Sequence, residues 1–350
     1  MVELQAIVQH LTQFTRQSTV LATLVSVEGS SYRRPGARLL LTSDGQRIGS
    51  ISGGCLEEDL IARARQVAAV GKPELVTYDT TSENDLVWGV GLGCNGIVKV
   101  LLERLAPAPA WAQALATRFR DNQATQLSVV WQARNPALLG THLGGDLPAL
   151  AADTHVFHDQ IDPPPRLLVF GAGDDARPLV KFAKELGWHV TIADPRPNFA
   201  NRPRFPNADE ILVLSASDAV KKINPASDAL AVIMTHHYVH DVPLLRDLLP
   251  RNLPYLGLLG PKKRAAKILA DLKSQGHAFA DEQLERLHAP VGLDLGAETP
   301  EEVALSIIAE IRATLARRDG RPLRERNRPI HDSIPPATTR HQNATTSHGE

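Results

Sequence analysis

The chain has few cysteines, no long apolar runs and almost no net charge. Its 350 residues include two cysteines, too few for a disulfide scaffold and typical of free thiols in a reducing cytoplasm. No apolar run reaches the roughly eighteen residues of a membrane-spanning helix, and we find no secretory signal at the N-terminus. The formal net charge of −1 gives no overall field to attract nucleic acid or an anionic membrane. We therefore expect a cytoplasmic protein that binds neither.

The length of the chain predicts two domains, and composition places the boundary between them. A proline triplet, Pro163–Pro165, resists both helix and sheet. We predict an α/β protein in which residues 1–162 form an N-terminal mixed α/β domain. Residues 163–318 are predicted to form a Rossmann-like, doubly wound parallel sheet with a C-terminal helix, and residues 319–350 a disordered polar tail.

The second half alternates short apolar runs with helical stretches. Such runs are typical of strands buried on both faces of a parallel sheet. Thr299-Pro-Glu-Glu302 has the pattern of a capping box with proline at the first helical position, which predicts a last helix. The predicted strands cover residues 167–170, 190–193, 211–214, 230–234 and 255–259.

A glycine turn follows the first of these predicted strands. Gly171-Ala-Gly173 begins a G-x-G-x-x-A pattern, and Asp194 ends the next strand about twenty residues on, where it could accept hydrogen bonds from a ribose. Asp174 and Asp175, however, put two carboxylates where a pyrophosphate would bind. We interpret them as caps of the following helix, and we expect a Rossmann fold more firmly than binding of NAD(P).

Two further segments fall at the carboxyl ends of predicted strands, where ligands bind in such folds. His236 and His237 are candidates for a ligand contact or proton carrier, or are loop histidines with solvent partners. Lys262, Lys263 and Arg264 begin a predicted helix. Because basic groups there oppose the helix dipole, they indicate an anion between them, or else a solvated basic face.

In the first half, a turn carries three arginines, Arg33, Arg34 and Arg38. Guanidinium groups suit phosphate or carboxylate ligands.

Both cysteines of the first half are next to glycines. Cys55 follows Gly53-Gly54 directly before a predicted helix, and Cys94 follows Gly93. Structural cysteines usually lie in apolar runs, so this setting favours a functional site over coincidence. A zinc site is the weaker interpretation, because two further ligands have no obvious candidates.

Taken together, these segments resemble the XdhC/CoxI family, accessory proteins of molybdenum hydroxylases. The resemblance extends over residues 5 to 315, with the segments in the family's order. The residues that carry it are 33–42 (RRPGARLLLT), 49–60 (GSISGGCLEEDL), 91–96 (GLGCNG), 169–180 (VFGAGDDARPLV), 194–196 (DPR), 234–241 (MTHHYVHD), 255–264 (YLGLLGPKKR) and 289–311 (APVGLDLGAETPEEVALSIIAEI).

The resemblance implies a chaperone, not a turnover enzyme, whose cargo is the molybdenum–molybdopterin cofactor. It implies cooperation with a cysteine desulfurase that sulfurates the cofactor, delivery to an apo hydroxylase of the xanthine dehydrogenase type, and a homodimer. Molybdopterin carries a phosphate, and molybdenum is soft toward sulfur, so Cys55 and Cys94 are candidate molybdenum contacts. The candidate cofactor-binding residues are Arg33, Arg34, Arg38, Gly53, Gly54, Cys55, Cys94, Gly171, Gly173, Asp194, Arg196, His236, His237, Lys262, Lys263 and Arg264.

Two alternatives to the chaperone are open at this point. One is an NAD(P)-dependent oxidoreductase that uses the Rossmann half, with His236 or His237 as proton donor. The other is a non-catalytic module whose Rossmann half docks a partner enzyme.

Overall fold

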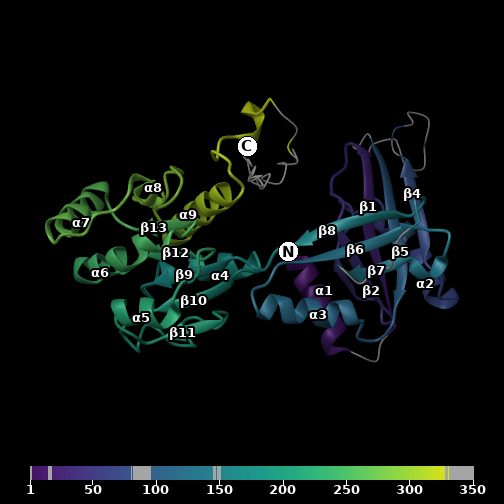
Figure 1. Ribbon diagram of the computed structural model, residues 1–350, viewed down its shortest axis with the longest axis horizontal. Coiled ribbons are helices and arrows are strands. Elements are labelled where there is room, and N and C mark those ends of the chain that lie inside the picture. Colours follow the sequence, from purple (N-terminus) through teal and green to yellow (C-terminus); the bar gives the residue numbers. More distant parts are fainter. Residues whose placement is uncertain are drawn as a thin grey trace, which may run out of the picture.

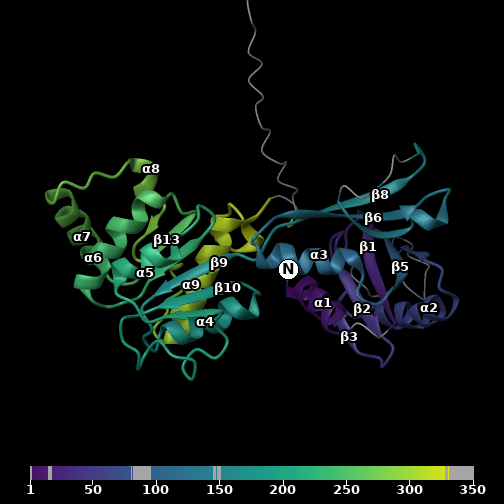
Figure 2. The ribbon, with the colours of Figure 1, turned by 60° about the horizontal axis from the view of Figure 1, so that its bottom comes forward.

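The structure is a computed structural model that describes residues 2–14, 18–79, 81, 96–144, 147, 151–327 and 330. Two halves lie side by side, with the N-terminus at their junction (Figures 1 and 2). Cys94, Gly91 and Gly93 fall outside the described residues, as does most of the predicted tail. In the described part of that tail, η3 (Leu323–Glu325) is a short 3-10 turn. No helix in the described ranges is long and apolar enough to cross a membrane.

The first half contains two antiparallel sheets. The larger has the order β3-β2-β1-β5-β4 and the smaller the order β7-β6-β8. The strands of the larger sheet are β1 (Thr19–Gly29), β2 (Arg38–Thr42), β3 (Arg47–Gly49), β4 (Glu74–Asp79) and β5 (Gly96–Leu105). The remaining elements are α1 (Val2–Gln13), α2 (Glu57–Val70), α3 (Ala110–Arg120), β6 (Thr125–Gln132), η1 (Pro136–Leu138), β7 (Gly140–Leu143) and β8 (His155–Ile161).

The five-stranded sheet is buried on both faces. Leu60, Ala64 and Val67 of α2 pack on one face. On the other face, Leu21 and Leu40 pack with α1, α3 and the second sheet. β2 and β3 form an antiparallel hairpin, and Gly71 ends α2 in the left-handed conformation with φ of 78°.

The second half is the predicted doubly wound parallel sheet. Its strand order is β11-β10-β9-β12-β13-β14, with all strands parallel and the first strand, β9, near the centre. From β9 the chain adds strands first on one side and then, from β12 on, on the other. The strands are β9 (Arg166–Phe170), β10 (His189–Ala193), β11 (Glu210–Leu212), β12 (Leu230–Ile233), β13 (Tyr255–Leu258) and β14 (Leu287–His288). The helices are α4 (Ala176–Glu185), α5 (Ala216–Ile223), α6 (Tyr238–Leu248), η2 (Leu249–Arg251), α7 (Lys262–Ser274), α8 (Asp281–Leu284) and α9 (Pro300–Leu315).

Apolar helix faces cover both sides of this sheet. The core on one side includes buried residues of α4 and α9, such as Leu179 and Ile307. The core on the other side draws on α5, α6 and α7, with Leu245 and Ile268 fully buried. The capping box at Thr299 is present as predicted. A crevice therefore opens at the carboxyl ends of β9 and β12, where the winding reverses.

The two halves touch through α1, α3 and a corner of the Rossmann unit. Gln5 in α1 donates a hydrogen bond to the Gly187 carbonyl over 3.1 Å, and Asn122 donates to Asp228 over 2.7 Å. The predicted division at residues 162 and 163 falls between β8 and β9.

Candidate functional site

The glycine turn after β9 brings the ends of three strands together. Gly171, with φ of 111°, donates a backbone hydrogen bond to Ala193 at the end of β10 over 2.8 Å. A Cβ on Gly171 would lie 2.4 Å from the Met234 carbonyl oxygen, directly after β12. Both conformation and space therefore require glycine here.

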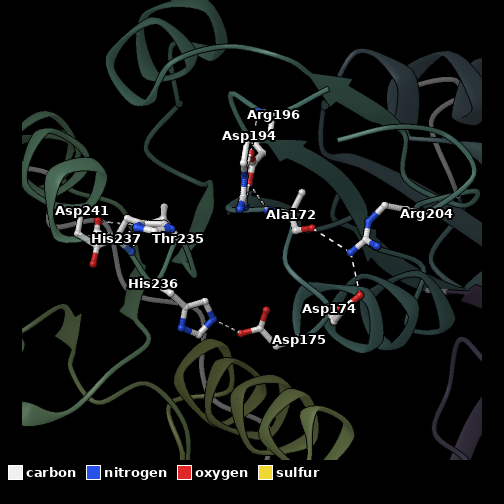
Figure 3. A network of polar contacts seen from close by, with 10 residues as sticks. All are labelled: Ala172, Asp174, Asp175, Asp194, Arg196, Arg204, Thr235, His236, His237 and Asp241. Carbon is white, nitrogen blue, oxygen red and sulfur yellow. Dashed lines mark hydrogen bonds and ion pairs between the residues drawn. The ribbon is translucent and has the colours of Figure 1, made fainter. Parts of the chain in front are cut away.

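Asp194 is the hub that joins this turn to the end of β10 (Figure 3). Its carboxylate accepts hydrogen bonds from the backbone nitrogens of Ala172 and Arg196, over 2.8 and 2.9 Å. It also accepts two from the Arg196 guanidinium, over 2.9 and 2.8 Å. Burial raises the pKa of Asp194, but these hydrogen bonds and the Arg196 charge outweigh it and lower the pKa below its usual value. Four bonds fill the acceptor positions of a carboxylate, which leaves none for a ribose hydroxyl.

Asp175 occupies the predicted N-cap position of α4, but its carboxylate does not cap the helix. Asp175 has helical backbone angles and makes no side-chain cap hydrogen bond. Its carboxylate lies 2.6 Å from His236 Nε2 instead, while Asp174 pairs with Arg204 over 2.9 Å (Figure 3). Arg177 lies 3.7 Å from Asp174 on its other side. Both carboxylates at the turn therefore have partners within the chain.

The two predicted histidines at the tip of β12 point to different places. His236, in the left-handed region with φ of 59°, points toward the glycine turn and Asp175. The His237 ring lies 5.8 Å from that of His240, centroid to centroid. The backbone nitrogen of His237 donates to the Thr235 hydroxyl over 3.1 Å, which fixes the tip.

A small cavity lies beside the loop that follows β12. Its apolar lining residues include three alanines, and its polar side chains come from the ends of β10 and β12 and from α6. The lining residues are Phe170, Gly171, Ala193, Asp194, Pro195, Arg196, Leu214, Ala216, Ala219, Thr235, His237, His240 and Leu244. A small set of polar groups on an apolar wall is typical of small-molecule sites.

The predicted basic cluster at the start of α7 does not line this cavity. Arg264 forms an ion pair with Asp241, whose side chain is 1% exposed and which also accepts from the Thr235 hydroxyl. Arg264 thus holds the tip of β12 in place. Lys262 and Lys263 are exposed in the first turn of α7.

The three predicted arginines of the first half have different surroundings. Arg33 forms an ion pair with Glu3 and donates to the Ser50 hydroxyl over 3.0 Å. Arg38 is 3% exposed and pairs with Asp159 over 2.7 Å, so it ties β2 to β8. The exposed Arg34 side chain makes no hydrogen bond or ion pair within the described ranges, so it is the one available to a ligand.

Hydrogen bonds of Ser52 and Glu57 fix the loop that carries Gly53, Gly54 and Cys55. The Ser52 hydroxyl accepts from the backbone nitrogen of Gly54 over 3.1 Å, and the Glu57 carboxylate accepts from the Ser52 backbone nitrogen over 2.9 Å. Burial raises the pKa of Glu57, but its hydrogen bonds with Ser52 and Leu56 outweigh it and lower the pKa. Cys55 in this loop has a free, exposed thiol.

The arginine loop and the cysteine loop are in contact. Besides the hydrogen bond between Arg33 and Ser50, the Tyr32 ring lies 3.9 Å from where a Gly53 Cβ would be. At the same end of the sheet, Gly29 pairs with Gly96 across β1 and β5. Among the residues described, no group of three or more His, Cys, Asp or Glu side chains could hold a metal ion. The molybdenum contacts by Cys55 and Cys94 stay predictions.

Sequence reasoning missed two features of the crevice. Arg204, which neutralises Asp174, lies 30 residues away in the proline-rich loop between β10 and β11. Ala216 and Ala219, on the cavity wall, come from α5. No local motif marks either, because both act through tertiary placement.

The fold and crevice define an α/β protein with a Rossmann domain joined to a mixed α/β domain, and comparisons with known proteins identify the family. Residues 15–79 match the family described as XdhC and CoxI, and residues 167–311 match the XdhC Rossmann domain. A Bacillus subtilis protein named as a probable xanthine dehydrogenase subunit is 35% identical over 321 residues, 86% of this chain and 94% of that protein. The chain therefore belongs to the XdhC and CoxI family.

One further relative and one solved structure are also similar to this chain over most of its length. The Escherichia coli molybdenum cofactor insertion chaperone PaoD is 24% identical over 295 residues, which cover 84% of this chain and 83% of PaoD. A crystal structure described as a xanthine dehydrogenase from Bacillus halodurans superposes with a TM-score of 0.75 and 34% identity, covering 92% of this chain and 99% of the other.

Proposed function

We propose that the protein is a chaperone that binds the molybdenum–molybdopterin cofactor and protects it. It then delivers the cofactor to an apo hydroxylase of the xanthine dehydrogenase type, after sulfuration by a cysteine desulfurase. Membership of the XdhC and CoxI family supports an accessory role, and the relative named as a cofactor insertion chaperone supports the cargo. The role requires binding and release, without turnover of the cofactor.

The observation that carries the proposal is the contact between the arginine and cysteine loops. The hydrogen bond from Arg33 to Ser50 and the Tyr32 ring beside Gly53 hold the two loops together. One loop presents the exposed Arg34 guanidinium and the other the exposed Cys55 thiol.

These two groups suit the two ends of the cargo. A guanidinium forms paired, charge-assisted hydrogen bonds with a phosphate. A thiolate is a soft ligand that suits molybdenum and its sulfur shell. The Glu57 carboxylate, which would repel an anion, is turned into the loop by its hydrogen bonds with Ser52 and Leu56.

The test is the cofactor content of protein produced anaerobically in a host that makes molybdopterin. Bound molybdenum and the fluorescence of the oxidised pterin are measured for the parent and for Arg34→Ala and Cys55→Ser. We expect both variants to lose most of the pterin while they keep the parent's unfolding midpoint, because both side chains are exposed.

The matched control is Arg65→Ala, which removes an exposed arginine from α2 in the same half of the chain. It should keep the parent's pterin content. Parent protein without pterin, even when free cofactor is supplied, would refute the proposal. Equal pterin in the parent and in both loop variants would move the site elsewhere.

A further inference from the structure

The cavity at the carboxyl ends of β9, β10 and β12 has no part in the proposed cargo site, which lies in the other half of the chain. We propose that this cavity binds a nucleotide whose ribose carries a phosphate, of which NADPH is the probe, with the nucleobase inside the cavity. The proposal rests on the cavity and on Arg196, and it does not depend on cofactor binding by the first half.

The walls of the cavity suit a flat, largely apolar ring. Alanine at Ala193, Ala216 and Ala219 leaves space that a larger side chain would fill, and Leu214 and Leu244 complete an apolar lining. The polar groups Thr235, His237 and His240 enter from the end of β12 and from α6, where they can donate to or accept from a base.

From the sequence alone, the carboxylates of Asp174 and Asp175 would repel a phosphate at the glycine turn, but in the structure both have partners within the chain. Arg204 and Arg177 face Asp174 and compensate its charge, and the Asp175 carboxylate is held in a contact with His236 Nε2. The backbone nitrogens of Gly173, Asp174 and Asp175 donate no hydrogen bond to any described residue. They lie at the start of α4, where a helix favours an anion.

Arg196 decides which ribose the cavity prefers. In a Rossmann unit, a free carboxylate at this position accepts from the ribose 2′-hydroxyl, whereas an arginine nearby accommodates a 2′-phosphate. Here the acceptor positions of Asp194 are filled within the chain. The Arg196 side chain is 42% exposed and lines the cavity. Its Nη1 atom makes no hydrogen bond to the described residues.

The orientation of this guanidinium is fixed before any ligand arrives. One edge is held by Asp194, and one face lies 3.9 Å from the centroid of the Phe199 ring. Because the group is already ordered, binding a phosphate costs little side-chain entropy. A charge-assisted hydrogen bond that only the phosphorylated ribose can accept gives a preference of about tenfold.

The experiment is calorimetric titration of the full-length protein with NADPH and, separately, NADH. We expect NADPH to bind about tenfold more tightly than NADH. Arg196→Ala should remove that difference: NADPH loses its phosphate contact, and NADH should bind no more weakly, because two acceptor positions of Asp194 become free for its ribose hydroxyl. Ala216→Leu should weaken both nucleotides, because it fills the cavity.

Ala270→Leu is the matched control, an alanine exposed on α7, and it should leave both affinities unchanged. The unfolding midpoint of each variant confirms that it is folded. Absence of binding at millimolar NADPH, equal affinity of the parent for the two nucleotides, or NADPH binding untouched by both cavity variants would each overturn the proposal. The pterin content of the same preparations tests the chaperone role separately, so failure of one proposal is distinguishable from failure of the other.

Discussion

His236 Nε2 lies 2.6 Å from the Asp175 carboxylate, which joins the tip of β12 to the glycine turn after β9. The two residues are 61 positions apart in the chain. The contact lies between the ends of β9 and β12, where the order of the strands reverses. The contact gives the Asp175 carboxylate a partner within the chain, and the Arg204–Asp174 pair compensates the charge of the other acid at the turn.

The backbone at His236 gives a stability prediction. A residue with a Cβ is disfavoured in the left-handed region, and His236 has φ of 59°. His236→Ala and His236→Gly both lose the contact with Asp175, but only glycine relieves the strain. We expect the glycine variant to be the more stable by about 1 kcal/mol in urea unfolding. An alanine variant as stable as the glycine variant would show that the position is unstrained.

The role of Arg204 can be tested with a double-mutant cycle. Arg204→Ala leaves Asp174 with Arg177 at 3.7 Å as its remaining ion-pair partner. We expect NADPH affinity to fall about fivefold, the effect of roughly 1 kcal/mol. Adding Asp174→Asn should restore it, because the uncompensated charge is gone. If the double variant binds as weakly as Arg204→Ala, the loss comes from altered packing and the charge argument fails.

The lowered pKa of Asp194 predicts acid sensitivity. Because its pKa is lower in the folded state, the stability it contributes is complete above the unfolded value of about 4. It disappears as the pH falls further, through the folded value. The difference in unfolding free energy between the parent and Asp194→Asn should therefore shrink between about pH 5 and pH 3.

The control for the Asp194 measurement is Asp121→Asn, an exposed carboxylate at the end of α3. It should track the parent across this pH range. A difference between the parent and Asp194→Asn that stays constant with pH would contradict the assignment of a lowered pKa to Asp194.

Arg34 and Arg38 were predicted as one ligand group, but their surroundings separate them. Arg38→Ala leaves the Asp159 carboxylate, 19% exposed, without its partner between the two sheets, so we expect a loss of about 3 kcal/mol or more in unfolding free energy. Arg34→Ala should change stability by less than about 0.5 kcal/mol. Chemical unfolding of both variants measures this, and equal destabilisation would refute the distinction.

The fold of the second half was largely predictable from the sequence because its signals are local. Apolar runs placed β9, β10, β12 and β13, and the capping box at Thr299 placed the start of α9. The edge strand β14 was missed, since two residues are too short to give a periodic pattern. These elements follow from propensity, capping and burial of neighbouring residues.

The candidate site was predictable only in part. The sequence identified the glycine turn, Asp194 and the histidine tip, because strand ends carry recognisable residue types. It could not supply the partners of Asp174 and Asp175, because Arg204 and His236 reach them only through tertiary folding. The sequence placed Asp175 correctly at the start of α4, but it could not show that the carboxylates of Asp174 and Asp175 contact distant residues and do not cap the helix.

The most direct test of the chaperone proposal is protection of the cofactor. Molybdenum cofactor released anaerobically from a molybdenum enzyme is mixed with the apo protein, exposed to air, and assayed over time for intact cofactor. We predict that the parent protein slows the loss of cofactor at an equimolar ratio, and that the variant carrying both Arg34→Ala and Cys55→Ser does not. Loss at the same rate with the parent protein as without it would contradict the proposed function.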